Sequence, residues 1–280
     1  MSKSAQLLII GLLVAAASLS ARADECEYSG ERSASVDTAG VKRIEISARA
    51  GSLTIDGVKG AKGIEAKGRA CVSEEKFLDD VRLEARREGD VAYLEVIMPD
   101  TEKVMVFGFS DIYATLDLRV RVPDDVPVVA IDSSGEAEVR NLAALDMTDS
   151  SGELRITDVR GDVTVRDSSG ELWLRNIGGN LKLSDSSGDV EIDGVERNVT
   201  VDVDSSGSLE IEHVKGNVSI EQDSSGDIGI ADVGGEVRID RDSSGSVDVR
   251  RVGGGFSLGA KGSGDVQVAE VKGKVDVPDR

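Results

Sequence analysis

The stretch "GELRITDVRGDVTVRDSSG", residues 152–170, decides the fold, because it ends on the letters DSSG that also close the segment before it. The intervals from one copy to the next are 17, 18, 18, 19, 19, 19 and 19 residues. So short and regular a period is typical of a solenoid, in which each repeat is one coil that buries its apolar side against its neighbours. The copies begin at Asp132, Asp149, Asp167, Asp185, Asp204, Asp223 and Asp242, and a variant, KGSG, begins at Lys261.

Aliphatic residues follow one spacing in every coil. In the opening stretch they are Leu154, Ile156, Val159, Val163 and Val165, separated by steps of 2, 3, 4 and 2 residues. Steps of two indicate short strands whose alternate side chains face one side. Apolar residues keep these places in the later coils, so the pattern predicts a continuous core between stacked parallel strands.

We therefore predict an all-β protein, a parallel β-solenoid of about 18–19 residues per coil. A left-handed helix of hexapeptides has a similar coil length, but it would place an aliphatic residue every six positions, unlike the spacing observed. The general preference for right-handed crossovers favours a right-handed or flattened two-sheet solenoid. The extra residue in the coil that precedes Asp204 is expected to form a bulge at a corner.

The DSSG letters are expected at the corner between two coils. Glycine accepts a positive φ there, and Asp and Ser side chains accept hydrogen bonds from turn N–H groups. Serines stacked along the axis could also bond to one another. Stacked aspartates, about 4.8 Å apart, would repel by about 0.9 kcal/mol even in water. We therefore expect a structural ladder in which turn N–H groups and hydroxyls hold the carboxylates of Asp149, Asp167, Asp185, Asp204, Asp223 and Asp242.

Calcium ions along the Asp column are the alternative to these hydrogen bonds. They are less favoured, because a calcium site usually converges more carboxylates than one per turn. The glycine-rich calcium nonapeptide is also missing from the sequence. No cofactor and no metal ligand set is therefore expected.

The first 23 residues read as a secretory signal. Lys3 precedes an apolar run from Leu7 to Ala17, and an A-x-A site predicts cleavage after Ala23. A retained membrane anchor is the alternative, but the run is shorter than the roughly 20 residues that a bilayer requires. A lipid anchor is not expected, because Cys26 does not directly follow the cleavage site. We expect export to the periplasm or the cell surface, with no membrane span in the mature chain.

Charge and cysteine content limit the partners. The chain has 33 basic and 53 acidic residues, a formal charge of −20, and loss of Lys3 and Arg22 would leave −22. Nucleic acid and anionic lipid would be repelled, so neither is expected as a partner. Cys26 and Cys71 are the only cysteines. In an oxidising compartment they predict one disulfide, with two buried free thiols as the alternative.

Residues 24–131 lack the regular repeat and are predicted to form an N-terminal cap and irregular first coils, continuous with the regular solenoid of residues 132–280. "SEEKFLDDV" suggests a short helix capped by Ser73. Gly89 and Asp90 suggest a hairpin. The apolar stretch 104–113 is expected to pack on the first coil or to form an exposed contact surface. Phe107 and Phe109 are therefore candidate contact residues.

Chemistry-bearing residues are few. His213 is the only histidine and occupies a corner position held elsewhere by Asn176, Asp158 or Asp232, which favours a turn residue over a general base. Trp173 lies between inward Leu172 and Leu174 and is therefore expected to face solvent. It is the third candidate contact residue, although a single exposed aromatic is often accidental.

The irregular, strand-rich start and the "SSGDV.I..V.GNV.I" coils resemble a bacterial family of unknown function whose members are named putative adhesins with β-strand repeats. The resemblance spans roughly residues 36–277 and implies a cell-envelope protein, with no catalytic residues to carry over. We expect a non-catalytic, adhesin-like scaffold that offers a rigid acidic surface to an envelope protein or glycan, with oligomerisation left open. The alternatives are a calcium-dependent surface module and a polysaccharide-active β-helix enzyme, which would need a groove with convergent carboxylates.

Overall fold

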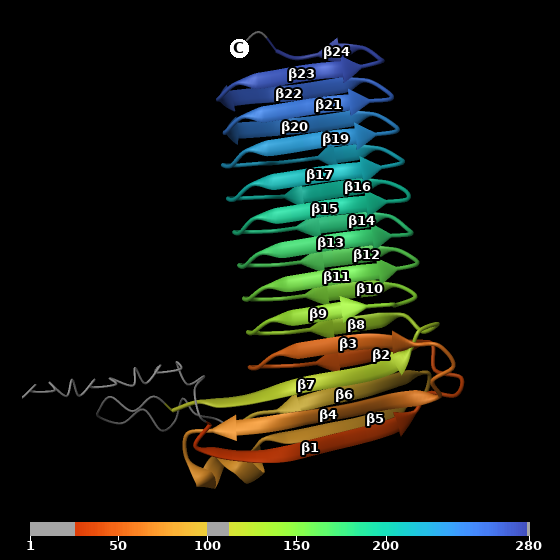
Figure 1. Ribbon diagram of the computed structural model, residues 1–280, viewed down its shortest axis with the longest axis vertical. Coiled ribbons are helices and arrows are strands. Elements are labelled where there is room, and N and C mark those ends of the chain that lie inside the picture. Colours follow the sequence, from red (N-terminus) through yellow and green to blue (C-terminus); the bar gives the residue numbers. More distant parts are fainter. Residues whose placement is uncertain (1–25, 100–111, 279–280) are drawn as a thin grey trace, which may run out of the picture.

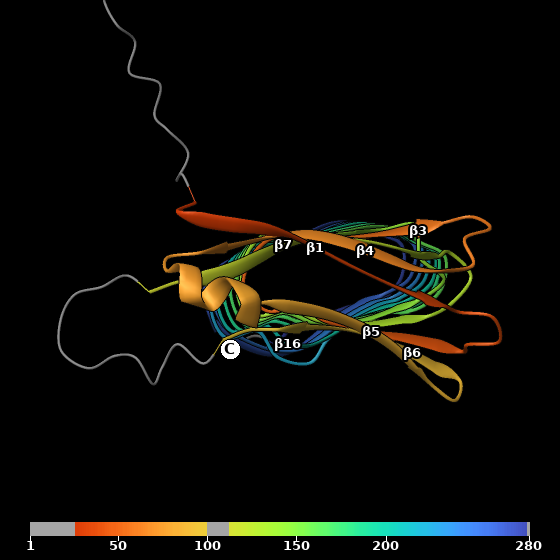
Figure 2. The ribbon, with the colours of Figure 1, turned by 90° about the horizontal axis from the view of Figure 1, so that it is seen from below.

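Two long sheets face each other along the whole chain in the computed structural model, which describes residues 26–99 and 112–278 (Figure 1). Each sheet has twelve strands, and successive coils contribute one strand to each sheet in turn. Viewed along the axis, the sheets form a flattened tube (Figure 2). The predicted parallel, two-sheet β-solenoid is thus confirmed, while its handedness stays a prediction.

Sheet A contains the first strand of every coil, and sheet B contains the second. In spatial order sheet A comprises β1 (Tyr28–Asp37), β4 (Gly63–Val72), β7 (Ala114–Pro123), β3 (Leu53–Val58), β9 (Ala137–Arg140), β11 (Leu154–Val159), β13 (Leu172–Ile177), β15 (Val190–Val195), β17 (Leu209–Val214), β19 (Ile228–Val233), β21 (Val247–Val252) and β23 (Val266–Val271). Sheet B comprises β24 (Val275–Asp276), β22 (Phe256–Ser263), β20 (Val237–Ser244), β18 (Val218–Ile220), β16 (Val199–Val203), β14 (Leu181–Ser184), β12 (Val163–Arg166), β10 (Leu145–Thr148), β8 (Val128–Ile131), β2 (Arg43–Ser47), β6 (Val91–Ile97) and β5 (Arg82–Glu88).

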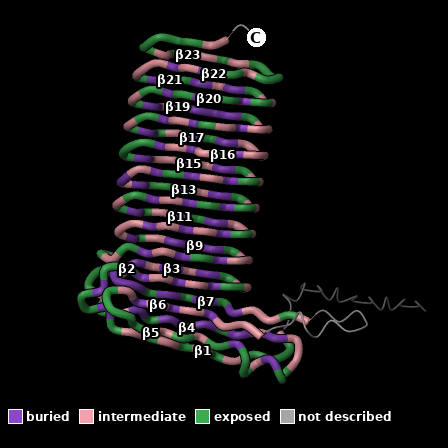
Figure 3. The backbone as a smooth tube through the Cα atoms, turned by 180° about the vertical axis from the view of Figure 1, so that it is seen from behind, coloured by how far each residue is buried: buried purple, intermediate pink, exposed green. Residues whose placement is uncertain are grey.

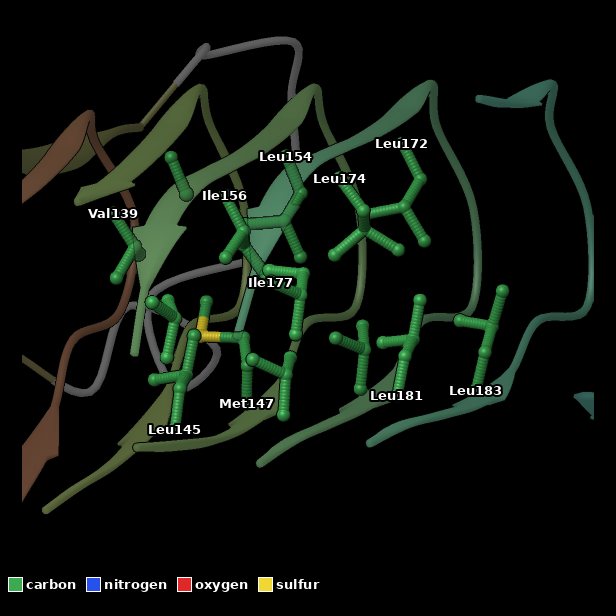
Figure 4. Close-up of a cluster of buried hydrophobic side chains, with 14 of the residues drawn as sticks. Val139, Leu145, Met147, Leu154, Ile156, Leu172, Leu174, Ile177, Leu181 and Leu183 are labelled. Carbon is green, nitrogen blue, oxygen red and sulfur yellow. The ribbon is translucent and has the colours of Figure 1, made fainter. Parts of the chain in front are cut away.

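The core is the ladder of aliphatic residues that the spacing predicts. Leu154, Leu172 and Val190 are in register on neighbouring strands, and none is more than 2% exposed. Leucine and isoleucine side chains from both sheets meet in the space between them (Figure 4). Buried and exposed residues alternate along every strand (Figure 3). Burial of apolar surface on both inner faces therefore holds the coils in register.

The DSSG corners stack with almost no space between coils. Gly170 has a φ of +133°, and a Cβ atom there would lie 1.6 Å from the carbonyl oxygen of Gly152, so only glycine fits. The second serine of each corner donates its hydroxyl to a carbonyl one coil earlier, as Ser169 does to Ser150 at 3.1 Å. The expected serine stack is therefore present, although the acceptors are main-chain oxygens.

The extra residue of the longer coils forms a bulge, as predicted. Leu183 of β14 pairs with Val201 of β16, whereas Ser184 pairs with Val203, so Asp202 has no partner on β14. The Asp202 carboxylate instead forms an ion pair with Lys182 at 2.9 Å. The bulge preserves the inward direction of the residues on either side of it.

The N-terminal cap has an order that the repeat does not foretell. The first coil, β2 and β3, lies between the cap and the regular coils, although its sequence precedes both. The chain then builds β4, β5, β6 and β7 below it before returning at β8 to stack on β2. β4 pairs antiparallel with both β1 and β7, so these longer strands close the end of the tube.

Two cap predictions are confirmed and one needs correction. β5 and β6 form the antiparallel hairpin around Gly89, and Cys26 and Cys71 form a disulfide. The segment after Ser73 is a 3-10 helix, η1 (Glu75–Asp80), whose N-cap is Glu74 and has no side-chain cap. The Ser73 hydroxyl instead accepts a hydrogen bond from the N–H of Tyr113. Within the described ranges no helix has the length and apolarity to cross a membrane.

Candidate functional site

Trp173 lies on the outer face of sheet A, in a row of residues that share one position in successive coils. The register places it between Arg155 of β11 and Glu191 of β15, with Glu210 on the next strand, as the repeat predicts. Its outward direction is confirmed, but the indole is half-buried instead of fully exposed. The reason is that neighbouring long side chains cover part of the ring.

One face of the indole is covered by a cation. The guanidinium of Arg155 lies 4.1 Å from the ring centroid, a cation–π contact, and it also pairs with Glu153. On the following strands, Arg175 pairs with Glu191 at 2.5 Å. The tryptophan is thus held in place by its neighbours on the rigid sheet.

A hollow of about 460 Å³ opens beside Trp173, over β15. The lining is strongly acidic, because six carboxylates border it. They are Glu171, Asp189, Glu191, Asp193, Glu210 and Glu212. Among the charged side chains lining the hollow, none is basic, so it is an electronegative depression next to an aromatic ring.

Gly229 creates room at one border of this hollow. It occupies the same row as Trp173, and the Glu210 carboxylate lies directly over it, where a Cβ atom would come within 2.0 Å of Oε2. Partial desolvation and then the charge of Glu212 raise the pKa of Glu210. The hollow therefore holds one carboxylate that a nearby cation would stabilise in its charged form.

The DSSG aspartates form a second unusual feature, a column inside the tube. All seven, from Asp132 to Asp242, are at most 4% exposed. Each follows the last inward aliphatic of its coil in the alternation, as Asp185 follows Leu181 and Leu183. The side chain therefore points into the core and not toward the solvent side of the corner.

The column does not have the hydrogen bonds that the sequence led us to expect. Asp167 accepts one at 2.8 Å from the N–H of Ser168, whereas both carboxylate oxygens of Asp132, Asp149, Asp185, Asp204 and Asp223 have no hydrogen-bond donor. The prediction that turn N–H groups and hydroxyls hold each carboxylate is wrong, because the alternation of the strand places the Asp side chain inward. Serine hydroxyls are also engaged with carbonyl groups along the axis.

Burial makes these carboxyl groups weak acids. Desolvation, the largest cause, raises the pKa of Asp132, Asp185 and Asp223 to about 7. It raises the pKa of Asp149 and Asp204 to about 6, and that of Asp167 and Asp242 above the ordinary value. At an effective dielectric constant of about 20, two ionised carboxylates about 4.8 Å apart would repel by about 3.5 kcal/mol. The column therefore retains protons at neutral pH.

The ends of the column differ in chemistry from its interior. Ala48 precedes Asp132 in the first coil, and its N–H donates to Ile131 as the Asp132 N–H donates to Thr148. At the other end Lys261 pairs in register with Asp242 and lowers its pKa against the effect of burial. One neutral residue and one cation thus bound the seven acids.

His213 belongs to a corner, as predicted. It adopts a left-handed backbone with a φ of 56°, at the position that Asn176, Asp158 and Asp232 occupy in other coils. Its exposed ring lies 2.8 Å from the Asp193 carboxylate, which raises the pKa of the imidazole. No serine or cysteine hydrogen-bonds to it among the described residues, so it has the surroundings of a turn residue.

The remaining candidates add no chemical centre. Phe107 and Phe109 lie outside the described residues. In the parts of the chain that are described, no three His, Cys, Asp or Glu side chains converge as metal ligands would. The structure thus brings Trp173 together with carboxylates of the neighbouring coils, which the repeat alone does not single out.

Sequence reasoning missed two features with signals in the sequence. Counting in steps of two from Leu181 through Leu183 reaches Asp185, which would have placed the aspartates inside. The "GGN" and "KGN" corners also signal an asparagine ladder, in which the side chain of Asn198 accepts a hydrogen bond from the N–H of Asn217 at 2.9 Å.

Comparison with solved structures finds proteins of low sequence identity that align over most of their length. A putative lipid binding protein from Parabacteroides distasonis is 15% identical, with 88% of this chain and 96% of that chain covered and a TM-score of 0.42. A putative adhesin from Parabacteroides merdae is 13% identical, with 90% and 97% covered and a TM-score of 0.37. A putative cell adhesion protein from Clostridium sporogenes is 13% identical, with 89% and 99% covered and a TM-score of 0.31.

No curated protein matches the chain. The family model described as Toastrack DUF4097 matches residues 41–277, which include the first coil, the cap hairpin and all the regular coils. With most of its length matched by that model, the chain belongs to the Toastrack DUF4097 family.

Proposed function

We propose that this protein is a non-catalytic, adhesin-like interaction scaffold of the cell envelope, and that the hollow beside Trp173 binds a protein partner through basic side chains. The observation that carries this proposal is the meeting of the only tryptophan with six carboxylates on one rigid face. The rest of the outer surface repeats charged residues without an aromatic anchor.

Physical chemistry favours a cationic ligand group in this hollow. A Lys or Arg side chain placed there would face carboxylates on three strands, and its aliphatic stem could lie along the indole. The formal charge of −20 adds a long-range attraction for basic partners that salt would screen. A neutral glycan is less favoured, because Arg155 already covers one face of the ring on which a sugar would stack.

The cellular location is part of the same proposal. The Cys26–Cys71 disulfide joins β4 to the residue pair before β1, and structural disulfides persist in oxidising compartments. Together with the apolar segment of residues 7–17 in the sequence, this supports export to the periplasm or cell surface.

The test is calorimetric titration with an oligolysine peptide, compared with a neutral chitin oligosaccharide. We expect saturable binding of the peptide that weakens with added salt, and no binding of the oligosaccharide. The double variant Glu210→Gln/Glu212→Gln should weaken peptide binding about tenfold, because two carboxylates of the hollow lose their charge.

A matched control separates the hollow from the general negative charge. Glu75→Gln/Asp125→Asn removes the same number of charges from exposed positions away from sheet A of the regular coils. This variant should bind with almost unchanged affinity. Equal weakening by the two double variants would mean that the peptide responds to net charge alone, and it would refute the proposed site. Binding of the oligosaccharide alone would replace the basic partner by a glycan.

A polysaccharide-active enzyme is the second candidate, because the raised pKa of Glu210 is a property of general acids. The hollow lacks the coil insertions that usually wall a groove, and its carboxylates repeat at the spacing of the strands. Incubation with cell-wall polysaccharide should therefore release no new reducing ends. Release that disappears in Glu210→Gln would establish catalysis instead.

A further inference from the structure

The last coil has an unpaired strand edge. In every regular coil the N–H at the start of the sheet A strand donates to the next coil, as Val247 donates to Asp265 at 2.9 Å. The equivalent group at the start of β23 belongs to Val266. β23 pairs with β21 alone and β24 pairs with β22 alone among the described residues, so this N–H faces outward without a strand partner.

The apolar ladder is also left open at this end. Val247, Val249 and Phe256 of the preceding coil are at most 1% exposed. Their counterparts Val266 and Val268 are only partly buried, and Val275 is 45% exposed. The end of the tube therefore presents both main-chain hydrogen-bonding groups and apolar side chains, which is the combination that pairs with another strand.

The opposite end cannot accept this edge as a further coil, because the cap covers it. β1 and β5 come together below the first coil, and η1 packs against β1 and β4 (Figures 1 and 2). The Arg32 side chain of β1 donates to the carbonyl oxygen of Val81 at 2.6 Å and so fixes η1 in place. A head-to-tail stack of copies is thus blocked, whereas two open ends can meet.

Charge permits such a meeting. From Lys261 to Asp276 the last coil carries three basic and three acidic residues, and so has no net charge. The coil from Asp185 to Val203 carries six acidic residues and one basic residue. Two copies of a chain with a formal charge of −20 would repel along their sides, but the last coils can approach each other without that cost.

We propose that two copies of this chain associate through their last coils, with β23 of one copy antiparallel to β23 of the other. Self-pairing of β23 uses a six-residue strand on each side, whereas β24 offers only two residues. The two-fold arrangement is closed, so it stops at a dimer. It extends sheet A across both copies and covers the exposed ends of both apolar ladders.

The test is the mass and shape of the purified protein in solution. Light scattering over a dilution series should show a dimer that dissociates on dilution, because an edge contact buries less than the roughly 1,600 Å² of a standard stable interface. Small-angle X-ray scattering of the dimer should give about twice the maximum length of the monomer, since the copies meet end to end.

Two substitutions at one position make the test specific. Val266→Pro removes the outward N–H without breaking a hydrogen bond inside the monomer, and should weaken dimerisation at least tenfold. Val266→Ala trims the side chain but keeps the N–H, and should still dimerise. Circular dichroism should show both variants folded. A wild-type protein that stays monomeric at high concentration, a dimer with side-by-side dimensions, or a dimer indifferent to Val266→Pro would each overturn the proposal.

Discussion

Replacing Asp185 by asparagine is expected to stabilise the folded chain at about pH 8 and to change its stability little near pH 5. The Asp185 carboxyl is 2% exposed, and neither oxygen has a hydrogen-bond donor. Its pKa is raised to about 7 by burial and by the charges of Asp167 and Asp204. Asparagine has nearly the shape of the protonated acid and cannot ionise, so it avoids the cost of a buried negative charge.

The magnitude follows from the difference between the folded pKa of about 7 and the ordinary value of 3.8. At 1.36 kcal/mol for each pKa unit, full ionisation would cost about 4 kcal/mol. Part of that cost disappears when neighbouring carboxyls in the column keep their protons, so about 2 kcal/mol is the expected gain for Asp185→Asn at about pH 8.

The sign of the pH dependence is opposite to that of an ordinary ion-paired aspartate. Because the folded pKa lies above the unfolded one, the folded state binds more protons between about pH 4 and pH 7. Stability is therefore fully present at about pH 4 and is lost as the pH rises through about 6 to 7. The wild-type chain should be more stable at pH 5 than at pH 8, and the difference should shrink in Asp185→Asn.

Urea denaturation at the two pH values, followed by circular dichroism, measures these free energies of unfolding. Asp125→Asn is the matched control, because Asp125 is exposed and outside the column. It should leave the pH dependence as it is in the wild type. If Asp185→Asn destabilises the chain at pH 8 by more than about 1 kcal/mol, the carboxylate is held in its charged form by a cation or by donors, and the reasoning fails.

Three further outcomes are expected. A chelator should leave the melting temperature unchanged, and added calcium should not raise it, because protons and not metal ions neutralise the column; a steep rise with calcium would contradict this. His213→Gly should stabilise the fold by about 1 kcal/mol in urea denaturation, since glycine adopts a φ of 56° without strain, and an unchanged free energy would mean that the Asp193 contact compensates. Gly170→Ala should cost more than about 4 kcal/mol because its Cβ would overlap the Gly152 carbonyl, whereas Gly60→Ala, with open space around it, should cost about 1 kcal/mol; similar losses would refute the packing argument.

The repeat made the regular coils predictable in detail. Steps of 2, 3, 4 and 2 residues gave the inward positions, and parallel stacking gave the neighbours of Trp173, because each coil repeats the same directions. The bulge at Asp202 was predictable for the same reason, since one added residue would otherwise turn Val203 and Asp204 to the wrong faces.

The cap was less predictable because its strands do not stack in chain order. The alternation in β4 and β7 indicates strands but does not say that β4 pairs antiparallel with β7, which inserts between β4 and β3. The hollow at Trp173 depends on the directions of long side chains, such as Glu210 lying over Gly229, which the repeat does not determine. The inward Asp column was predictable from alternation, but the frequency of DSSG in turns pointed to a solvent-facing corner.

The fluorescence of Trp173 during titration with the oligolysine peptide tests the proposed binding site most directly. Trp173 is the only tryptophan in the chain, so its emission reports events at the hollow and nowhere else. We predict a saturable change in emission whose midpoint matches the calorimetric dissociation constant and is displaced in Glu210→Gln/Glu212→Gln. Calorimetric binding without any change in Trp173 emission would place the peptide elsewhere on the protein and would contradict the proposed function.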